Sequence, residues 1–295
     1  MNLEIIRDLV NGENFNLVQM KYGLYKYELN EILDERLCSN AANLNIEEQE
    51  IIKKIYMENA SMMDITDEKV MFISDTHMGR TYQRDDYFQF VLDYCKYNGI
   101  HSLIHAGGIS DGRCTENGEP KWFENDIEAR KNAEIVLNDY PTTSDLTQYV
   151  ISGNHDEWYD EVNVQFFKEL DKKQNVVLIG NRTAFFTICG YPILLKHDMV
   201  PWHTLVTNND ISNLIPYSLT ISGHSHISRF NSSVIYLPTL SRNIIHTNEK
   251  DGLPGCVIMQ VLKEGNIIKL QFDRIYFTMD DNVEKGPSHI YTLKK

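Results

Sequence analysis

The sequence predicts an α/β fold in which two packed β-sheets are covered by helices, and a small helical segment precedes them. Three observations support this prediction. Short apolar runs alternate with helical patterns from residue 69 to about residue 180, which is typical of a sheet that contains parallel strands. The second half of the chain is mostly strand-like. Residues 1–66 show helical spacing of apolar residues before any strand pattern begins.

Residues 1–66 are predicted to form a separate helical domain. Apolar residues recur at helical spacing in NLEIIRDLV, FNLVQMKYG and YELNEILDERL, and Gly23 lies between the last two as a glycine at a helix C-terminus would. Residues 16–33 resemble a helix-turn-helix, which places its second helix in a DNA groove. That second helix is acidic, whereas phosphate neutralisation needs basic residues. We therefore favour a packing or dimerisation domain over a DNA-binding one.

Residues 67–295 are predicted to form the second domain. VMFIS, from Val70 to Ser74, is a short apolar run typical of a strand that is buried on both faces. Helices are then predicted at 85–99, 123–140 and 162–173, and strands at 101–108, 149–154 and 176–180. Further strands are predicted at 184–188, 191–197, 218–224, 233–238, 255–262 and 267–277. This order suggests two packed sheets with helices outside them.

The composition argues against several classes of protein. The chain has 295 residues, of which 42% are hydrophobic, and a formal net charge of −14, which argues against a broad basic surface for nucleic acid or anionic membrane. Its five cysteines are scattered without a C-x-x-C pair, so neither a zinc ribbon nor a disulfide framework is indicated. The chain starts without a signal-peptide pattern and has no apolar run of about 20 residues. We predict a cytoplasmic protein with no membrane partner.

Five polar motifs lie at or just after the ends of predicted strands, where ligands bind in open α/β sheets. They are ISDTHMG with Asp75 and His77, HAGGISDGR from Gly108 to Arg113, SGNHDEW with Asn154, His155 and Asp156, LLKHDM with His197, and SGHSHIS with His224 and His226. Imidazole, carboxylate and amide oxygen are ligands of divalent metals. In D-x-H or H-x-H at a strand end, alternate side chains point the same way, so two ligands can reach one ion.

Each motif taken alone has an ordinary explanation. A D-x-H at a strand end is usually a capping aspartate beside a surface histidine, and N-H-D is more often part of a turn. A single histidine such as His197 is more often hydrogen-bonded in the core or at the surface. The five motifs together, in this order and each after an apolar strand, favour a metal site over these explanations.

The set of motifs resembles the calcineurin-like metallophosphoesterase superfamily, whose pattern runs D-x-H, G-D-x-x-D-R/G, G-N-H-D/E, H and G-H-x-H. The resemblance extends from about Lys69 to Phe277. It implies a four-layer αββα sandwich of two mixed β-sheets flanked by helices. It also implies two divalent metal ions, for which Mn²⁺ is favoured and Fe, Zn, Ni or Mg are alternatives.

The resemblance also implies a role for each motif residue. By motif position, Asp75, His77 and His226 bind the first ion, and Asn154, His197 and His224 bind the second. His155 protonates the leaving oxygen or stabilises charge at phosphorus, Asp156 orients His155, and Arg113 contacts a phosphate oxygen.

Gly108 departs from the family pattern, because the family has there the aspartate that bridges both ions. By family position Asp111 supports the loop and does not bridge. A glycine supplies no ligand, so each ion is expected to lose one bond, and activity is expected to be reduced or strongly dependent on metal concentration. Restoring the carboxylate with Gly108→Asp is expected to raise metal affinity and turnover, unless the backbone at 108 has a positive φ.

The favoured function is therefore divalent-metal-dependent phosphoester hydrolysis. A phosphodiester, such as nucleic acid or a nucleotide, is preferred to a monoester as the substrate. The alternative is a catalytically weakened member of the family that binds a phosphorylated ligand, nucleic acid or a partner protein, which Gly108 favours. A homo-oligomer formed through the N-terminal helices is a further expectation.

Overall fold

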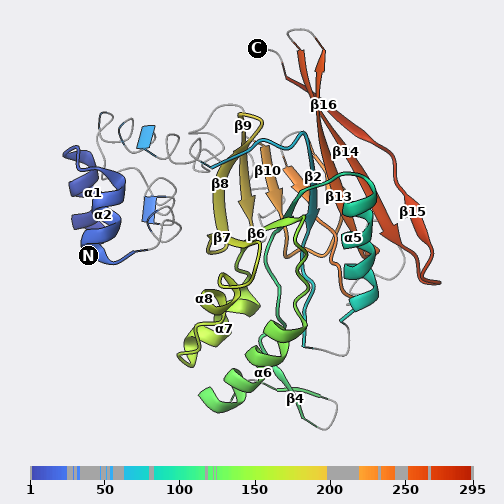
Figure 1. Cartoon of the computed structure of the whole chain (residues 1–295), viewed down its shortest axis with the longest axis horizontal. Coiled ribbons are helices and arrows are strands. Elements are labelled where there is room, and N and C mark those ends of the chain that lie inside the picture. The colour runs from blue at the N-terminus through green and yellow to red at the C-terminus, as the bar shows by residue number, and fades with distance from the viewer. Residues whose placement is uncertain are drawn as a thin grey trace.

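Figure 1 shows the chain in a computed structural model. It describes residues 2–24, 29, 32–33, 47, 51, 54–55, 63–79, 83–116, 119–121, 123, 125–197, 219–231, 234–242, 252–264 and 267–293. Two mixed β-sheets face each other and helices flank them, as the sequence predicts.

The larger sheet combines parallel and antiparallel strands. Its parallel part consists of β2 (Lys69–Ile73), β3 (Ser102–His105), β6 (Thr147–Ile151) and β7 (Val176–Gly180). The antiparallel part consists of β13 (Gly255–Glu264), β14 (Ile267–Phe277), β15 (Val283–Lys285) and β16 (His289–Leu293). The strand order is β15-β14-β13-β2-β3-β6-β7, with β16 also on β14. The strands β15 and β16 are not anticipated by the sequence pattern.

The smaller sheet has the order β1-β8-β9-β10-β12-β11. Its strands are β1 (Asp64–Ile65), β8 (Thr183–Ile188), β9 (Tyr191–Lys196), β10 (Leu219–Ser222), β11 (Arg229–Phe230) and β12 (Val234–Tyr236). The strands β9, β10 and β12 run parallel, so β9 and β10 end at the same edge.

Strand β2 shows how the layers are held together. Val70 and Phe72 are buried between the two sheets, whereas Met71 and Ile73 are buried under the helices on the other face. Because successive side chains of a strand point to opposite faces, a strand between two cores must be apolar throughout. The prediction that VMFIS is buried on both faces is confirmed.

Helices cover the outer face of the larger sheet. They are α5 (Asp85–Tyr97), α6 (Asp126–Asp139), α7 (Asn154–Glu161) and α8 (Phe166–Leu170). Helix α6 begins where the Asn125 side chain accepts a hydrogen bond from the backbone of Glu128 at 3.0 Å, which satisfies one free N–H of the first turn. The helix predicted at 162–173 is shorter, because Val162 ends α7 and Asn163 takes a left-handed φ of +58°.

The N-terminal helices lie beside the smaller sheet in Figure 1. They are α1 (Asn2–Val10) and α2 (Phe15–Tyr22), and they share a hydrophobic cluster with Phe185 of β8 and Leu194 of β9. Gly23 ends α2 in a left-handed conformation, with its N–H bonded to the carbonyl of Gln19, as predicted. Most of the following predicted helix, at 27–37, lies outside the described residues.

The predicted domain boundary between residues 66 and 67 falls just after β1. Asp64 and Ile65 pair with β8, so this two-residue strand belongs to the sheet and not to the helical segment. The division into two domains remains a prediction, as does oligomerisation through the helices.

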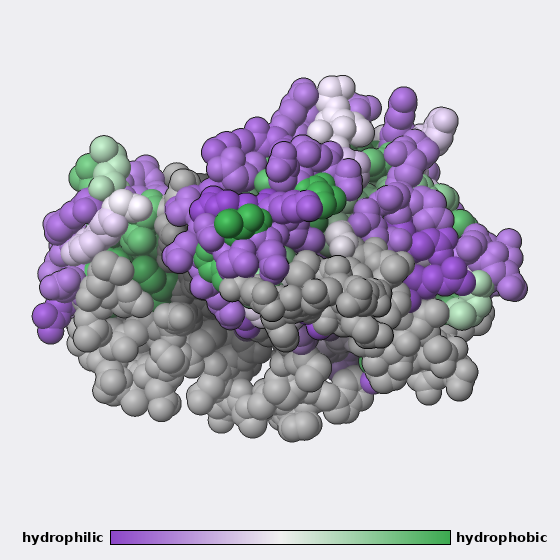
Figure 2. Space-filling view, turned by 90° about the horizontal axis from the view of Figure 1, so that it is seen from below, coloured by the Kyte–Doolittle hydropathy of each residue, from purple (hydrophilic) through white to green (hydrophobic). Residues whose placement is uncertain are grey.

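The coloured part of the face drawn in Figure 2 is largely hydrophilic, with small separate hydrophobic areas. Across the described ranges, no helix is both long and apolar enough to cross a membrane.

Candidate active site

The six predicted metal ligands follow the carboxyl ends of four strands. Asp75 and His77 follow β2, Asn154 follows β6, His197 follows β9, and His224 and His226 follow β10. The loop from Gly107 to Arg113 follows β3. Since β2, β3 and β6 run parallel, and so do β9 and β10, these segments meet at one edge of the sandwich.

The backbone at four of these ligands is left-handed. The φ angle is +54° at Asp75, +45° at His77, +67° at His224 and +56° at His226. A non-glycine residue pays about 1–2 kcal/mol for this conformation, and such strain clusters at functional sites. Asp75 and His77 therefore come together through a turn beyond the strand end and not through strand alternation, which corrects the expectation from the sequence. His224 and His226 instead lie in two different groups of donor atoms.

A first group of donor atoms comes from the loops that follow β2 and β10. His77 Nε2 lies 3.1 Å from His226 Nε2, and Asp75 Oδ1 lies 3.6 Å and 3.3 Å from those two nitrogens respectively. All three residues are buried, and their donor atoms can share one metal ion. They are the residues expected to bind the first ion.

A second group lies directly beside the first. Asn154 Oδ1 is 3.1 Å from His197 Nε2 and 3.1 Å from His224 Nδ1. The other nitrogen of His197, Nδ1, lies 2.6 Å from the carbonyl of Ala106. That carbonyl only accepts, so Nδ1 carries the proton and Nε2 presents its lone pair toward Asn154, as in metal-binding histidines. These are the residues expected at the second ion.

The donor set fits divalent metal ions. Asp75 Oδ1 is buried and has no hydrogen-bond partner among the described residues. An unsatisfied buried acceptor costs about 1–3 kcal/mol, and a cation removes that cost. Imidazole nitrogens with carboxylate and amide oxygens suit Mn²⁺, Fe²⁺ and Zn²⁺ alike, so the donors alone do not select one metal.

The charges of the protein without metal follow from burial and proximity. Burial opposes ionisation of Asp75, but the neighbouring His226 and His197 imidazoles hold its pKa well below the ordinary value. Burial likewise opposes protonation of His77, yet Asp111 and Asp75 raise its pKa to about 9. Burial lowers the pKa of His197 to about 4, which keeps this ligand neutral.

His155 lies beside the first group, in the first turn of α7. Its ring centroid is 4.9 Å from that of His77, and its Nδ1 lies 2.9 Å from the carbonyl oxygen of Asp111 and 3.7 Å from Asp111 Oδ1. Asp111 Oδ1 also lies 3.5 Å from His77 Nδ1. The contact between Asp111 and His155 is one that the sequence analysis missed, although Asp111 stands at a motif position.

Asp156 has a different role from the predicted one. Its carboxylate accepts backbone hydrogen bonds from Gly108 at 3.0 Å, Ile109 at 3.2 Å, Ser110 at 2.7 Å and Gly153 at 2.7 Å. From the third position of α7, its side chain turns back over the helix start and across to the loop after β3. Asp156 therefore fixes that loop, and Asp111 takes the place beside His155 that was expected for Asp156.

Arg113 lies at the edge of the site. Its Nε donates to Asp111 Oδ2 at 3.2 Å, and its guanidinium carbon is 5.4 Å from the ring centroid of Trp158. Trp158 also lies against His155, with ring centroids 4.2 Å apart. Arg113 is partly exposed and close to His155, so its position suits contact with an anion.

Gly108 has a φ of +68°, the conformation that an added side chain resists. A Cβ atom at this position would lie 2.6 Å from Asp75 Oδ1, 3.1 Å from the Asp75 Cα and 3.1 Å from His197 Cε1. Position 108 therefore faces the middle of the site, as the family pattern requires, but the space beside it is taken by the Asp75 carboxylate.

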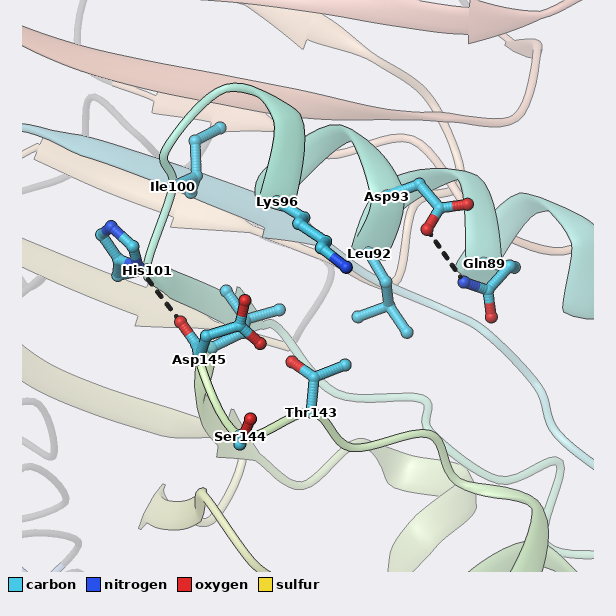
Figure 3. A pocket seen from close by; sticks show the side chains of 10 residues that line it. Gln89, Leu92, Asp93, Lys96, Ile100, His101, Thr143, Ser144 and Asp145 are labelled. Carbon is cyan, nitrogen blue, oxygen red and sulfur yellow. Dashed lines mark hydrogen bonds between the residues drawn. The ribbon is translucent and has the colours of Figure 1, made fainter.

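A separate cavity of about 370 Å³ lies at the other end of the strands (Figure 3). It is lined by residues that include His101, just before β3, and Leu146, just before β6, with Lys96 and Asp93 of α5. It is therefore not part of the candidate site.

Comparison with known proteins supports the family assignment. The protein-family model described as calcineurin-like phosphoesterase matches residues 68–228, which include all six candidate ligands. No curated protein matches the chain. Among solved structures, a single mutant of Vps29 from Entamoeba histolytica has 13% identity, covers 77% of this chain and 99% of its own, and has a TM-score of 0.39. Vps29 from Chaetomium thermophilum has 10% identity, covers 77% and 97%, and also has a TM-score of 0.39.

Proposed function

The chain belongs to the calcineurin-like phosphoesterase family, and on that basis we propose that it is a divalent-metal-dependent enzyme that hydrolyses a phosphodiester. One observation carries the proposal. The buried Asp75 Oδ1, with no hydrogen-bond partner among the described residues, lies within 3.7 Å of the Nε2 atoms of His77, His197 and His226. A carboxylate oxygen so placed among imidazoles is a site for a cation.

The proposed ligands are the two groups already described. Asp75, His77 and His226 hold one ion, and Asn154, His197 and His224 hold the other, with Mn²⁺ as the favoured metal. A bound divalent ion polarises a phosphoryl oxygen and makes water an effective nucleophile at neutral pH.

The protein groups around the ligands position the substrate and the proton. The Asp111 carbonyl accepts the Nδ1 proton of His155, which fixes the imidazole ring and leaves Nε2 for the leaving oxygen. Arg113 supplies a permanent positive charge for a phosphate oxygen, and the N-terminus of α7 adds the partial charge of a helix dipole. The substrate class, including nucleic acid or a nucleotide, belongs to the proposal.

A second function is favoured by Gly108. Without a carboxylate at this position the chain has one ligand fewer than the family pattern, and a weakly filled metal centre would bind a phosphorylated ligand, nucleic acid or a protein partner without turning it over. This second function differs from the proposed hydrolase activity in one respect: the protein binds metal but cleaves no ester.

The test is hydrolysis of bis-p-nitrophenyl phosphate with Mn²⁺ and with EDTA. We expect Mn²⁺-dependent release of nitrophenol. His224→Ala is expected to lower the rate at least about 100-fold, because loss of a metal ligand reduces activity more than loss of a residue that only hydrogen-bonds to a ligand. His101→Ala is the matched control, because this exposed histidine lies at the opposite end of the strands. Full activity of His224→Ala would refute the proposed centre. Mn²⁺ binding that His224→Ala weakens, without hydrolysis by the unaltered chain, would instead support the second function.

A further inference from the structure

Asp75 Oδ1 is a donor atom that the two ligand groups share. It lies 3.3 Å from His226 Nε2 and 3.6 Å from His77 Nε2 in the first group. It also lies 3.7 Å from His197 Nε2 in the second group. Two donor atoms that bind one ion at about 2.1 Å and at angles of 90–120° are separated by roughly 3.0–3.6 Å. The distances from Asp75 Oδ1 therefore allow it to share one ion with His77 and His226, and they come within about 0.1 Å of allowing it to share a second ion with His197.

The rest of the Asp75 carboxylate is held in place. Ser74 Oγ donates to Asp75 Oδ2 at 2.6 Å, and the backbone N–H of His224 donates to the same oxygen at 2.9 Å. Because Oδ2 already accepts two hydrogen bonds, Oδ1 is the oxygen that faces the imidazoles. Its lone pairs have no hydrogen-bond partner among the described residues.

Gly108 explains how the carboxylate comes to occupy this position. A Cβ at residue 108 would lie 2.6 Å from Asp75 Oδ1, closer than two such atoms can approach. A side chain at 108 and the Asp75 oxygen therefore compete for the same space. Where the family pattern places its bridging aspartate, this chain has a glycine, and the space is filled by Asp75.

We propose that Asp75 Oδ1 bridges the two metal ions of this chain, in place of the side chain missing at residue 108. The inference rests on the proposed metal centre and adds a second role for Asp75, which the family pattern assigns to the first ion alone. Two dications a few ångströms apart repel strongly, and an anion bound to both reduces that repulsion. Asp75 thus makes the occupancy of the two positions depend on each other.

The test compares Asp75→Asn with His226→Ala by titrating Mn²⁺ and measuring free Mn²⁺ by electron paramagnetic resonance. In Asp75→Asn the amide oxygen must take the Oδ2 position, because Ser74 and the N–H of His224 donate there. The NH₂ group then faces the imidazoles and binds no metal. We expect both Mn²⁺ affinities to fall by more than about 10-fold in Asp75→Asn, but only one to fall in His226→Ala.

The spectrum of the Mn²⁺-saturated protein gives a second measurement. A bridged pair shows magnetic coupling between the ions, which we expect in the unaltered chain but not in Asp75→Asn. Circular dichroism checks that each variant is folded. If Asp75→Asn keeps one ion at the unaltered affinity, as His226→Ala does, the bridge is overturned while the metal centre stands. If the unaltered chain binds no Mn²⁺, both the bridge and the proposed function fail.

Discussion

An aspartate at position 108 is expected to destabilise the protein without metal and to make its stability depend strongly on Mn²⁺. The backbone there has a φ of +68°, and the added Cβ would lie 2.6 Å from Asp75 Oδ1. Backbone strain and the shift of neighbouring atoms together cost about 2–5 kcal/mol. Two carboxylates about 4 Å apart repel by a further 4 kcal/mol or so at an effective dielectric constant near 20.

Gly108→Asn separates these two costs, because asparagine has the same shape without the charge. In EDTA we expect Gly108→Asp to melt about 10 °C below Gly108→Asn, since 1 kcal/mol corresponds to roughly 2–4 °C for a protein of this size. Saturating Mn²⁺ turns the repulsion into metal binding. It is expected to remove or reverse this difference, although the left-handed backbone at residue 108 opposes the gain in metal affinity that the sequence predicts for an aspartate there.

Gly99→Asn is the control for backbone strain. Gly99 has a similar φ of +62°, but a Cβ there meets nothing within 4 Å. We expect this variant to lose about 1 kcal/mol and to respond to Mn²⁺ as the unaltered chain does. Equal melting temperatures for Gly108→Asp and Gly108→Asn in EDTA would show that position 108 does not face the Asp75 carboxylate, and the reasoning would be refuted.

Two further predictions concern stability away from the site. Asn14 caps α2 by accepting the backbone N–H of Asn16 at 2.9 Å, so Asn14→Ala is expected to lower the free energy of unfolding in urea by about 1 kcal/mol, whereas Asn16→Ala leaves it nearly unchanged. Hydrogen bonds from Arg84 and Tyr87 lower the pKa of Asp281. A lowered carboxyl pKa contributes stability above the ordinary value of about 4 and loses it as the pH falls further. The melting temperature of Asp281→Asn is therefore expected to lie below that of the unaltered chain at pH 7 and to approach it at pH 3; an equal gap at both values would contradict the assigned contact.

Much of the architecture follows from local sequence patterns. The alternation of apolar runs and helical segments predicts the parallel part of the larger sheet, and VMFIS is buried on both faces as expected. These predictions succeed because side-chain periodicity depends on neighbouring residues only. The short strand β1 is not identifiable in this way, since Asp64 and Ile65 are set in the sheet by β8, more than a hundred residues later.

At the candidate site, the sequence predicts the types of residue but not their contacts. The types and order of the six candidate ligands are visible in the motifs, because the chemistry of metal binding restricts which side chains can serve. The contacts of the carboxylates are not visible. Asp156 lies next to His155 in the chain, yet it bonds to the loop around Ile109, and Asp111 reaches His155 from the other side.

The sequence by itself determined the family, the chemical nature of the donors and the absence of a carboxylate at position 108. Only the tertiary structure decided which oxygen fills the space beside that glycine. The reason is that the position of Asp75 Oδ1 depends on the left-handed backbone at Asp75 and on the N–H of His224, 149 residues away. A motif describes neighbours in the chain, whereas a shared metal ligand is defined by atoms that folding brings together.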